Sequence, residues 1–271
     1  MPERQPLAVQ LYSFRDALAE DRPATLAKTA ALGFGAVEPF GIGDPNVDPA
    51  TRVENAKAFR RDLDAAGLTV CSTHGFAPLG PNADAVLDEL DALGTDVLIA
   101  PSPGLFPGLA DTDWQSHDQV KRFAEAVNTA AENAARRGKK FGFHNHWSEL
   151  ALQPDGTTGL ERMYSFAADN VIAEVDLYWV NVGGADPAKI VSSIGDRVGM
   201  VHAKDGPGTP EQKMPMVALG EGAVDNEAAI AAGTKIGWHI IELDTCATDV
   251  FEAARKGAQR LVDNGWSRFE V

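Results

Sequence analysis

The chain of 271 residues carries 24 lysines and arginines against 39 aspartates and glutamates, a formal net charge of −15. Such an excess of negative charge repels phosphate backbones and anionic lipid surfaces, so nucleic acid and membranes are excluded as expected partners. No run approaches the roughly 18 apolar residues that a membrane span needs. The first ten residues carry charges where a signal peptide would have its apolar segment, so we expect a soluble cytoplasmic protein.

The length and the cysteine content narrow the class further. A chain of 271 residues can bury one sizeable core, and we expect residues 1–271 to form a single domain. Cys71 and Cys246 are the two cysteines, and they lack the close spacing of a metal-binding pair. Neither a disulfide scaffold nor a thiolate zinc site is predicted, and both cysteines are expected to pack.

Eight short segments rich in apolar residues recur along the chain and predict strands. They span residues 7–14, 36–40, 69–76, 96–102, 140–146, 171–179, 198–205 and 238–244. Helical spacing separates them, and the first four helical segments end at Gly33, Gly67, Gly94 and Gly138. Glycine accepts the left-handed conformation that closes many helices. Later helices are predicted to begin near Gly156, Asp186, Asp225 and Asp249, the three aspartates acting as N-caps.

This alternation of strands and helices predicts the fold class. Eight strand–helix units with right-handed crossovers close into a (β/α)8 TIM barrel. The alternative, an open doubly wound sheet, would favour a phosphate-binding GxGxxG after the first strand, and the sequence has none there. The Gly/Pro-rich stretches at 41–49, 101–109 and 204–222 follow strands, so we place them on the catalytic rim of the barrel.

Polar residues stand at four strand ends where a barrel core normally has Val, Ile and Leu. They are His144, Asn145, His146, Glu174, Asp176, His202, Lys204, Glu242 and Asp244. Because residues two apart share one face of a strand, His144 and His146 are expected to point into the barrel mouth and Asn145 away from it. Mixed carboxylate and imidazole ligands suit Mn²⁺, Co²⁺, Zn²⁺ or Mg²⁺. Carboxylates gathered in one mouth also require a cation, so one divalent metal ion is predicted.

Seven segments in chain order together resemble the xylose-isomerase-like superfamily of sugar phosphate isomerases/epimerases, in its HNH-bearing branch. They are residues 10–16, 73–76, 143–150, 174–180, 201–205, 219–222 and 242–244. The resemblance covers essentially the whole chain and implies a metal shell of His144, Asp176, His202 and Glu242. His144 stands where ketose epimerases of this superfamily usually have glutamate, which leaves two carboxylates in the shell.

The remaining candidates each have two interpretations. His146 is a general base or substrate donor, or a structural hydrogen-bonding group, and Glu149 is a second proton-transfer group or a solvated loop charge. Lys204 polarises a carbonyl oxygen or caps a carboxylate. Glu38 and His74 contact sugar hydroxyls or give buried polar support, and Trp147 and Trp179 form a platform for a sugar ring or pack in the core. His117 and His239 are expected to be structural.

The resemblance implies chemistry on a sugar. We expect a metal-dependent isomerase/epimerase that acts through an enediolate on a ketose or keto-sugar, and we favour an unphosphorylated one because no Arg/Lys cluster or P-loop marks a phosphate site. The alternative is a lyase or dehydratase that performs β-elimination on a 3-keto-glycoside or inosose. A homo-oligomer and a non-catalytic partner subunit also stay open. The negative charge disfavours a nuclease.

Overall fold

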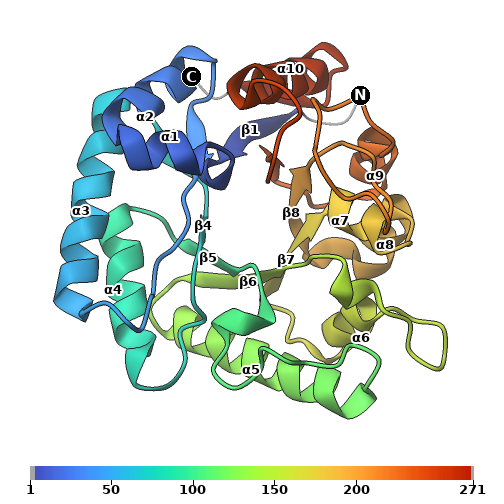
Figure 1. Ribbon diagram of the computed structural model, residues 1–271. Helices are drawn as coiled ribbons and strands as arrows, with labels where there is room; N and C mark the ends of the chain where they lie inside the picture. Colours follow the sequence, from blue (N-terminus) through green and yellow to red (C-terminus); the bar gives the residue numbers. More distant parts are fainter. Residues whose placement is uncertain (1–3, 270–271) are drawn as a thin grey trace.

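A ring of parallel strands surrounded by helices makes up the computed structural model, which describes residues 4–269 (Figure 1). The strands are β1 (Gln5–Gln10), β2 (Ala36–Glu38), β3 (Thr69–Val70), β4 (Thr73–His74), β5 (Val97–Ala100), β6 (Lys140–His144), β7 (Val171–Asp176), β8 (Val198–Ala203) and β9 (Trp238–Ile241). Neighbours follow the order β3-β2-β1-β9-β8-β7-β6-β5-β4, and β10 (Ser267–Phe269) pairs with β1. The predicted (β/α)8 barrel is confirmed.

The third barrel strand is interrupted, which is why nine strands fill eight positions. Between β3 and β4 the chain still bonds to the second strand, since the Cys71 amide donates to the Val37 carbonyl at 3.1 Å. The His74 amide donates to the Pro39 carbonyl at 2.8 Å, while His74 pairs with Ile99 on the other side. These bonds join the two ends of the strand order and close the ring.

The helices lie outside this ring (Figure 1). They are α1 (Arg15–Glu20), α2 (Arg22–Ala31), α3 (Pro49–Ala66), α4 (Ala83–Leu93), α5 (His117–Arg136), α6 (Gly159–Phe166), α7 (Leu177–Val182), α8 (Pro187–Ile194), α9 (Asn226–Ala232) and α10 (Val250–Asp263). Within residues 4–269, none of them has the length and apolar character required to cross a bilayer.

The expected helix signals are confirmed with one exception. Gly33, Gly67, Gly94 and Gly138 all have positive φ angles. The side chains of Asp186, Asp225 and Asp249 accept backbone amides at the starts of α8, α9 and α10. The start of α6 was predicted too early at Gly156, because Thr158 is the N-cap and forms a reciprocal capping box with Glu161.

Several strands end earlier than predicted because a polar side chain turns the backbone. The strand expected at 171–179 stops at Asp176, whose Oδ1 accepts the Trp179 amide at 2.9 Å and starts helix α7. The strand expected at 7–14 stops at Gln10, whose Oε1 accepts the Tyr12 amide at 3.0 Å. Apolar and aromatic residues follow both stops, so composition alone favoured longer strands.

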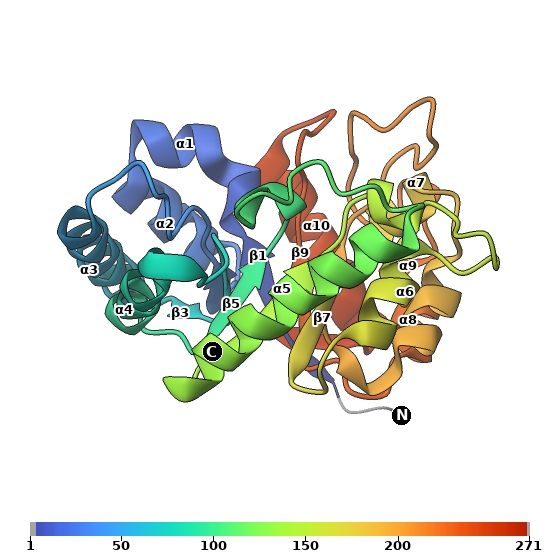
Figure 2. The ribbon, with the colours of Figure 1, turned by 90° about the horizontal axis from the view of Figure 1, so that it is seen from below.

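The barrel interior changes from apolar to charged along its axis. Alternate strand positions point inward, and the lower inward layer is apolar: Ala8, Ala36, Cys71, Ile99, Met200 and Ile240. Two residues further along β1, β2 and β8 come Gln10, Glu38 and His202, and the neighbouring strand β7 contributes Glu174. Figure 2 shows the long loop after β8 and helix α1 at the same end of the barrel. The apolar layer therefore forms the floor on which a polar site is built.

His239 belongs to strand β9, and its buried side chain contacts Ser267 of β10. Burial lowers its pKa from 6.5 to about 4, and its Nδ1 is 2.7 Å from the Ser267 hydroxyl. As the pH falls below about 6.5, His239 becomes protonated in the unfolded chain but stays neutral in the folded chain. His239 therefore lowers the free energy of unfolding by about 2 kcal/mol between pH 7 and pH 5. In urea titrations, we expect the free energy of unfolding of His239→Asn to fall by about 2 kcal/mol less than that of the wild type over this pH range. An identical loss in both proteins would contradict this environment.

Candidate functional site

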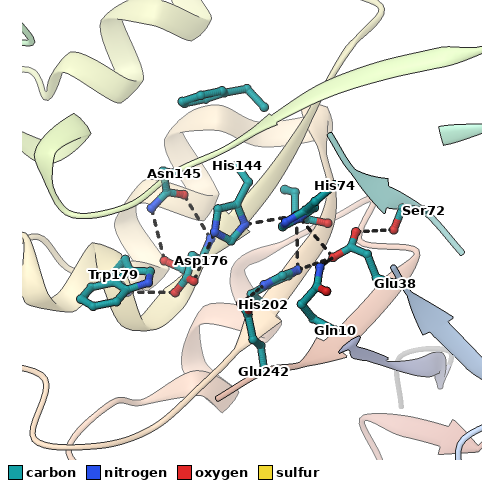
Figure 3. Close-up of polar contacts among 12 residues, drawn as sticks. Gln10, Glu38, Ser72, His74, His144, Asn145, Asp176, Trp179, His202 and Glu242 are labelled. Carbon is teal, nitrogen blue, oxygen red and sulfur yellow. Dashed lines mark hydrogen bonds and ion pairs between the residues drawn. The ribbon is translucent and has the colours of Figure 1, made fainter. Parts of the chain in front are cut away.

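Two layers of ionisable side chains fill the C-terminal end of the barrel (Figure 3). The deeper layer surrounds Glu38 and Glu174, both buried. His74 Nε2 lies 2.7 Å from Glu174 Oε2 and 3.1 Å from Glu38 Oε1, and His202 Nε2 lies 2.9 Å from the same Glu38 oxygen. Gln10 and Ser72 also donate hydrogen bonds to Glu38. Glu38 and His74 therefore connect the residues of this deeper charged layer.

The upper layer contains the four residues expected to form the metal shell. His144, Asp176, His202 and Glu242 are buried, and one potential ligand atom from each lies within 4.8 Å of all the others. His202 Nδ1 is 2.7 Å from Glu242 Oε2, and His144 Nε2 is 3.5 Å from Asp176 Oδ2. A second group of the same kind, His74, His144, Glu174 and His202, lies deeper and shares two histidines with it.

The donor set fits a divalent cation. Asp176 Oδ2 is buried and lies 2.8 Å from the Lys204 ammonium, and Asp176 Oδ1 is fixed by the Trp179 amide. The side-chain oxygen of Asn145 accepts the Asp176 amide at 3.1 Å and so holds this strand end in place. Burial and the neighbouring His202 keep the pKa of His144 well below 6.5, so its imidazole is neutral, the form that ligates metals.

Lys204 lies within the same group of carboxylates. It is 1% exposed, and its Nζ lies 2.5 Å from Glu242 Oε2, 2.8 Å from Asp176 Oδ2 and 2.9 Å from Asp244 Oδ2. Burial opposes its charge, but these carboxylates raise its pKa well above 10.5. The sequence offered two roles for Lys204, polarising a carbonyl oxygen or capping a carboxylate. The structure shows its contacts with carboxylates.

The electrostatics leave negative charge in the site. Burial raises the pKa of Asp176 from 3.8 to about 6, against the influence of Lys204 and His202. Burial also opposes protonation of His74, yet Glu38 and Glu174 raise its pKa to about 10. Around neutral pH the site therefore holds more carboxylates than positive groups, a balance that a divalent cation would correct.

A cavity of about 320 Å³ opens above these residues. One wall carries polar groups, including His144, His146, Lys204, Glu242 and Asp244, and the other is formed largely by Tyr12, Phe40, Phe76, Pro101 and Leu105. His144 and His146 both line it, as their spacing predicted. Burial, reinforced by Lys204, lowers the pKa of His146 to about 4, so this imidazole is neutral near pH 7. The cavity thus combines charged groups with an apolar wall.

Six of the expected site residues do not line the cavity: Glu38, Asp176 and His202 lie in the charged layers described above, and Glu149, Trp147 and Trp179 lie near His146. Glu149 is 1% exposed, and its Oε2 accepts the His146 amide at 3.1 Å and the Ser148 hydroxyl at 2.9 Å. Trp147 is 41% exposed and packs against the buried Trp179 with ring centroids 4.8 Å apart. Lys213 covers Trp147 at 3.8 Å from the ring centroid. These contacts support the loop that carries His146.

Sequence reasoning missed several residues of the site. The sequence singles out neither Gln10 nor Ser72, and it places Glu174 among the polar residues at strand ends without assigning it a role. Gln10 follows Ala8 by two positions on β1 and therefore points inward, a signal that strand alternation contains. Tyr12 lies in a 3-10 turn after β1 and Phe40 in the loop after β2, and the sequence does not show that their rings meet edge to face with centroids 5.2 Å apart.

The fold and the site define a (β/α)8 barrel with a buried carboxylate–imidazole centre at the C-terminal ends of its strands. Residues 26–263 match the model of the xylose isomerase-like TIM barrel family, and the chain belongs to this family. A search of curated proteins found no match.

Solved structures share the fold at low sequence identity. A sugar phosphate isomerase/epimerase from Parabacteroides distasonis is 22% identical, with a TM-score of 0.76 over 97% of this chain and 96% of the other. A 3-keto-D-glucoside 4-epimerase from E. coli is 17% identical, with a TM-score of 0.65 over 96% and 100%. A probable 3-DHS dehydratase from Bacillus anthracis is 14% identical, with a TM-score of 0.66 over 96% and 99%.

Proposed function

We propose that this protein is a divalent-metal-dependent isomerase/epimerase of a ketose or keto-sugar. The observation that carries the proposal is the buried donor set His144, Asp176, His202 and Glu242, of which His144 and Glu242 line a cavity of about 320 Å³. A metal bound there would supply a Lewis acid beside a substrate carbonyl and so favour loss of the adjacent carbon-bound proton. An epimerase and a dehydratase among the structural relatives are consistent with enolate chemistry on this fold.

The chain's own residues supply the proton transfers. We assign His146 as the base that removes the proton next to the carbonyl, because it lines the cavity and its imidazole is neutral. Glu149 would position His146 through the bond to its amide. Lys204 would place an ammonium near the substrate oxygens. Return of the proton to the opposite face of the same carbon gives epimerisation, and its return to the former carbonyl carbon gives isomerisation.

The lining also supports an unphosphorylated substrate. Lys204 and His74 are the cationic side chains that line the cavity among the described residues, and both are already paired with carboxylates. A phosphate would meet Asp244 and Glu242 at close range, which costs free energy. We propose that the apolar face of a sugar ring packs on Tyr12 and Phe40, with Trp147 and Trp179 supporting the far side of the mouth.

A β-elimination on a 3-keto-glycoside or inosose is the second candidate. One observation favours it: His144 contributes no negative charge to the proposed shell, which would leave more positive charge on the metal to stabilise the enolate. The reaction would begin with the same proton abstraction. It would then expel the β-oxygen substituent instead of returning the proton.

Solvent deuterium uptake tests both candidates together. The protein with added Mn²⁺ is incubated in D₂O with free ketoses and with 3-keto-glycosides, and products are identified by mass spectrometry and NMR. We expect label at the carbon next to the carbonyl in at least one substrate class. An epimer that carries the label supports the first candidate, and a released aglycone supports the second. No label and no product across the panel would reject both.

A further inference from the structure

The ammonium of Lys204 contacts two carboxylates of the proposed metal set. It contacts Asp176 Oδ2 at 2.8 Å and Glu242 Oε2 at 2.5 Å. The same two oxygens face the histidines of the metal set, at 3.5 Å from His144 Nε2 and 2.7 Å from His202 Nδ1. One cation, supplied by the chain, therefore already lies against both carboxylates of the proposed metal set.

A metal ion and this ammonium compete for the same oxygens. A divalent ion lies about 2.0–2.2 Å from its carboxylate ligands. With Lys204 in its present position, the two cations would be separated by only a few ångströms in a buried environment, where like charges repel strongly. Metal binding therefore requires the Lys204 side chain to move.

Asp244 is a carboxylate toward which the Lys204 side chain can move. Its Oδ2 accepts a hydrogen bond from Lys204 Nζ at 2.9 Å, and its side chain is 17% exposed beside the cavity. Asp176 Oδ2 lies at a similar distance from Lys204 Nζ, 2.8 Å, but belongs to the proposed metal set. Asp244 is therefore a partner for the ammonium that lies outside this set.

We propose that Lys204 is an internal counter-cation that a divalent metal displaces from Asp176 and Glu242 toward Asp244. Metal loading then directs the ammonium into the cavity, beside the substrate, so the site acquires both cations in one step. This inference rests on the proposed metal set. It assigns Lys204 a role in metal affinity that is separate from its contact with substrate.

Direct Mn²⁺ binding measures the competition without any substrate. Isothermal titration calorimetry compares the wild-type chain with Lys204→Met and with Lys213→Met, a lysine removed from the carboxylates, over Trp147. We expect Lys204→Met to bind Mn²⁺ about tenfold more tightly or better, because the competing charge is gone. Lys213→Met should match the wild type. Equal or weaker binding by Lys204→Met overturns the proposal.

Asp244→Asn separates displacement from simple charge removal. In the wild-type background this change removes a negative charge and also the carboxylate that would bind the displaced Lys204 ammonium. In the Lys204→Met background it removes only the charge. We expect Asp244→Asn to weaken Mn²⁺ binding more in the presence of Lys204 than in its absence, a non-additive double-mutant cycle. Equal weakening in the two backgrounds overturns the displacement.

Two further outcomes are distinguished by the same titrations. If Lys204→Met does not fold, Lys204→Gln replaces it in the cycle, because glutamine removes the charge and keeps a hydrogen-bond donor for Asp244. Mn²⁺ bound with equal affinity by wild type and Lys204→Gln rejects the role of Lys204 and leaves the metal set standing. No Mn²⁺ bound by the wild type or by either Lys204 variant rejects the metal set and this inference together.

Discussion

Asp176→Asn is expected to lose the metal ion and, with it, the activity. Asp176 is fully buried, and its Oδ1 caps helix α7 while its Oδ2 faces His144. Asparagine keeps an oxygen for the cap but presents either a neutral oxygen or an amide group to the metal. Loss of an outer partner already costs roughly 10–100-fold in metal affinity, and loss of a charged ligand should cost more. Metal analysis of the purified variant, with circular dichroism to confirm folding, measures this effect.

Glu174→Gln is the matched comparison, because Glu174 belongs to the deeper donor set and not to the upper one. We expect it to retain metal, since it supports His74 and His144 from below. If Glu174→Gln loses the metal while Asp176→Asn retains it, the deeper set of His74, His144, Glu174 and His202 is the metal site. Full occupancy in both variants would contradict both sets.

His146→Gln is expected to keep the metal and lose about 10²-fold or more in kcat, the usual scale for a positioned acid or base. The His146 ring lines the cavity and is neutral at pH 7, whereas glutamine cannot accept a proton there. Steady-state kinetics with the substrate identified by deuterium uptake, together with metal analysis of the same sample, check this result. A near wild-type kcat would return His146 to a structural role.

Glu149→Gln separates positioning from proton transfer. Its side-chain carbonyl can still accept the His146 amide and the Ser148 hydroxyl. If Glu149 acts through the loop, the loss of kcat should be well below that of His146→Gln. A loss as large as that of His146→Gln would instead make Glu149 a direct proton-transfer group.

The sequence was informative where side-chain chemistry acts locally. The aspartate N-caps of α8, α9 and α10 were predicted because a capping oxygen binds amides within its own first turn. The inward direction of His144 and His146 followed from the two-residue period of a strand. Strand ends were less predictable, since the turns after Gln10 and Asp176 depend on one side chain each, within otherwise apolar stretches.

What the sequence determined by itself was therefore the order of strands and helices, the barrel class and the polar residues at the strand ends, all of which follow from periodicity and spacing. The tertiary structure decided which of those residues meet. Glu38 and His202 are 164 positions apart and touch at 2.9 Å, and Lys204 meets three carboxylates from two other strands. Such contacts depend on the closure of the ring and the stagger between its strands, which bring together side chains that no local pattern relates.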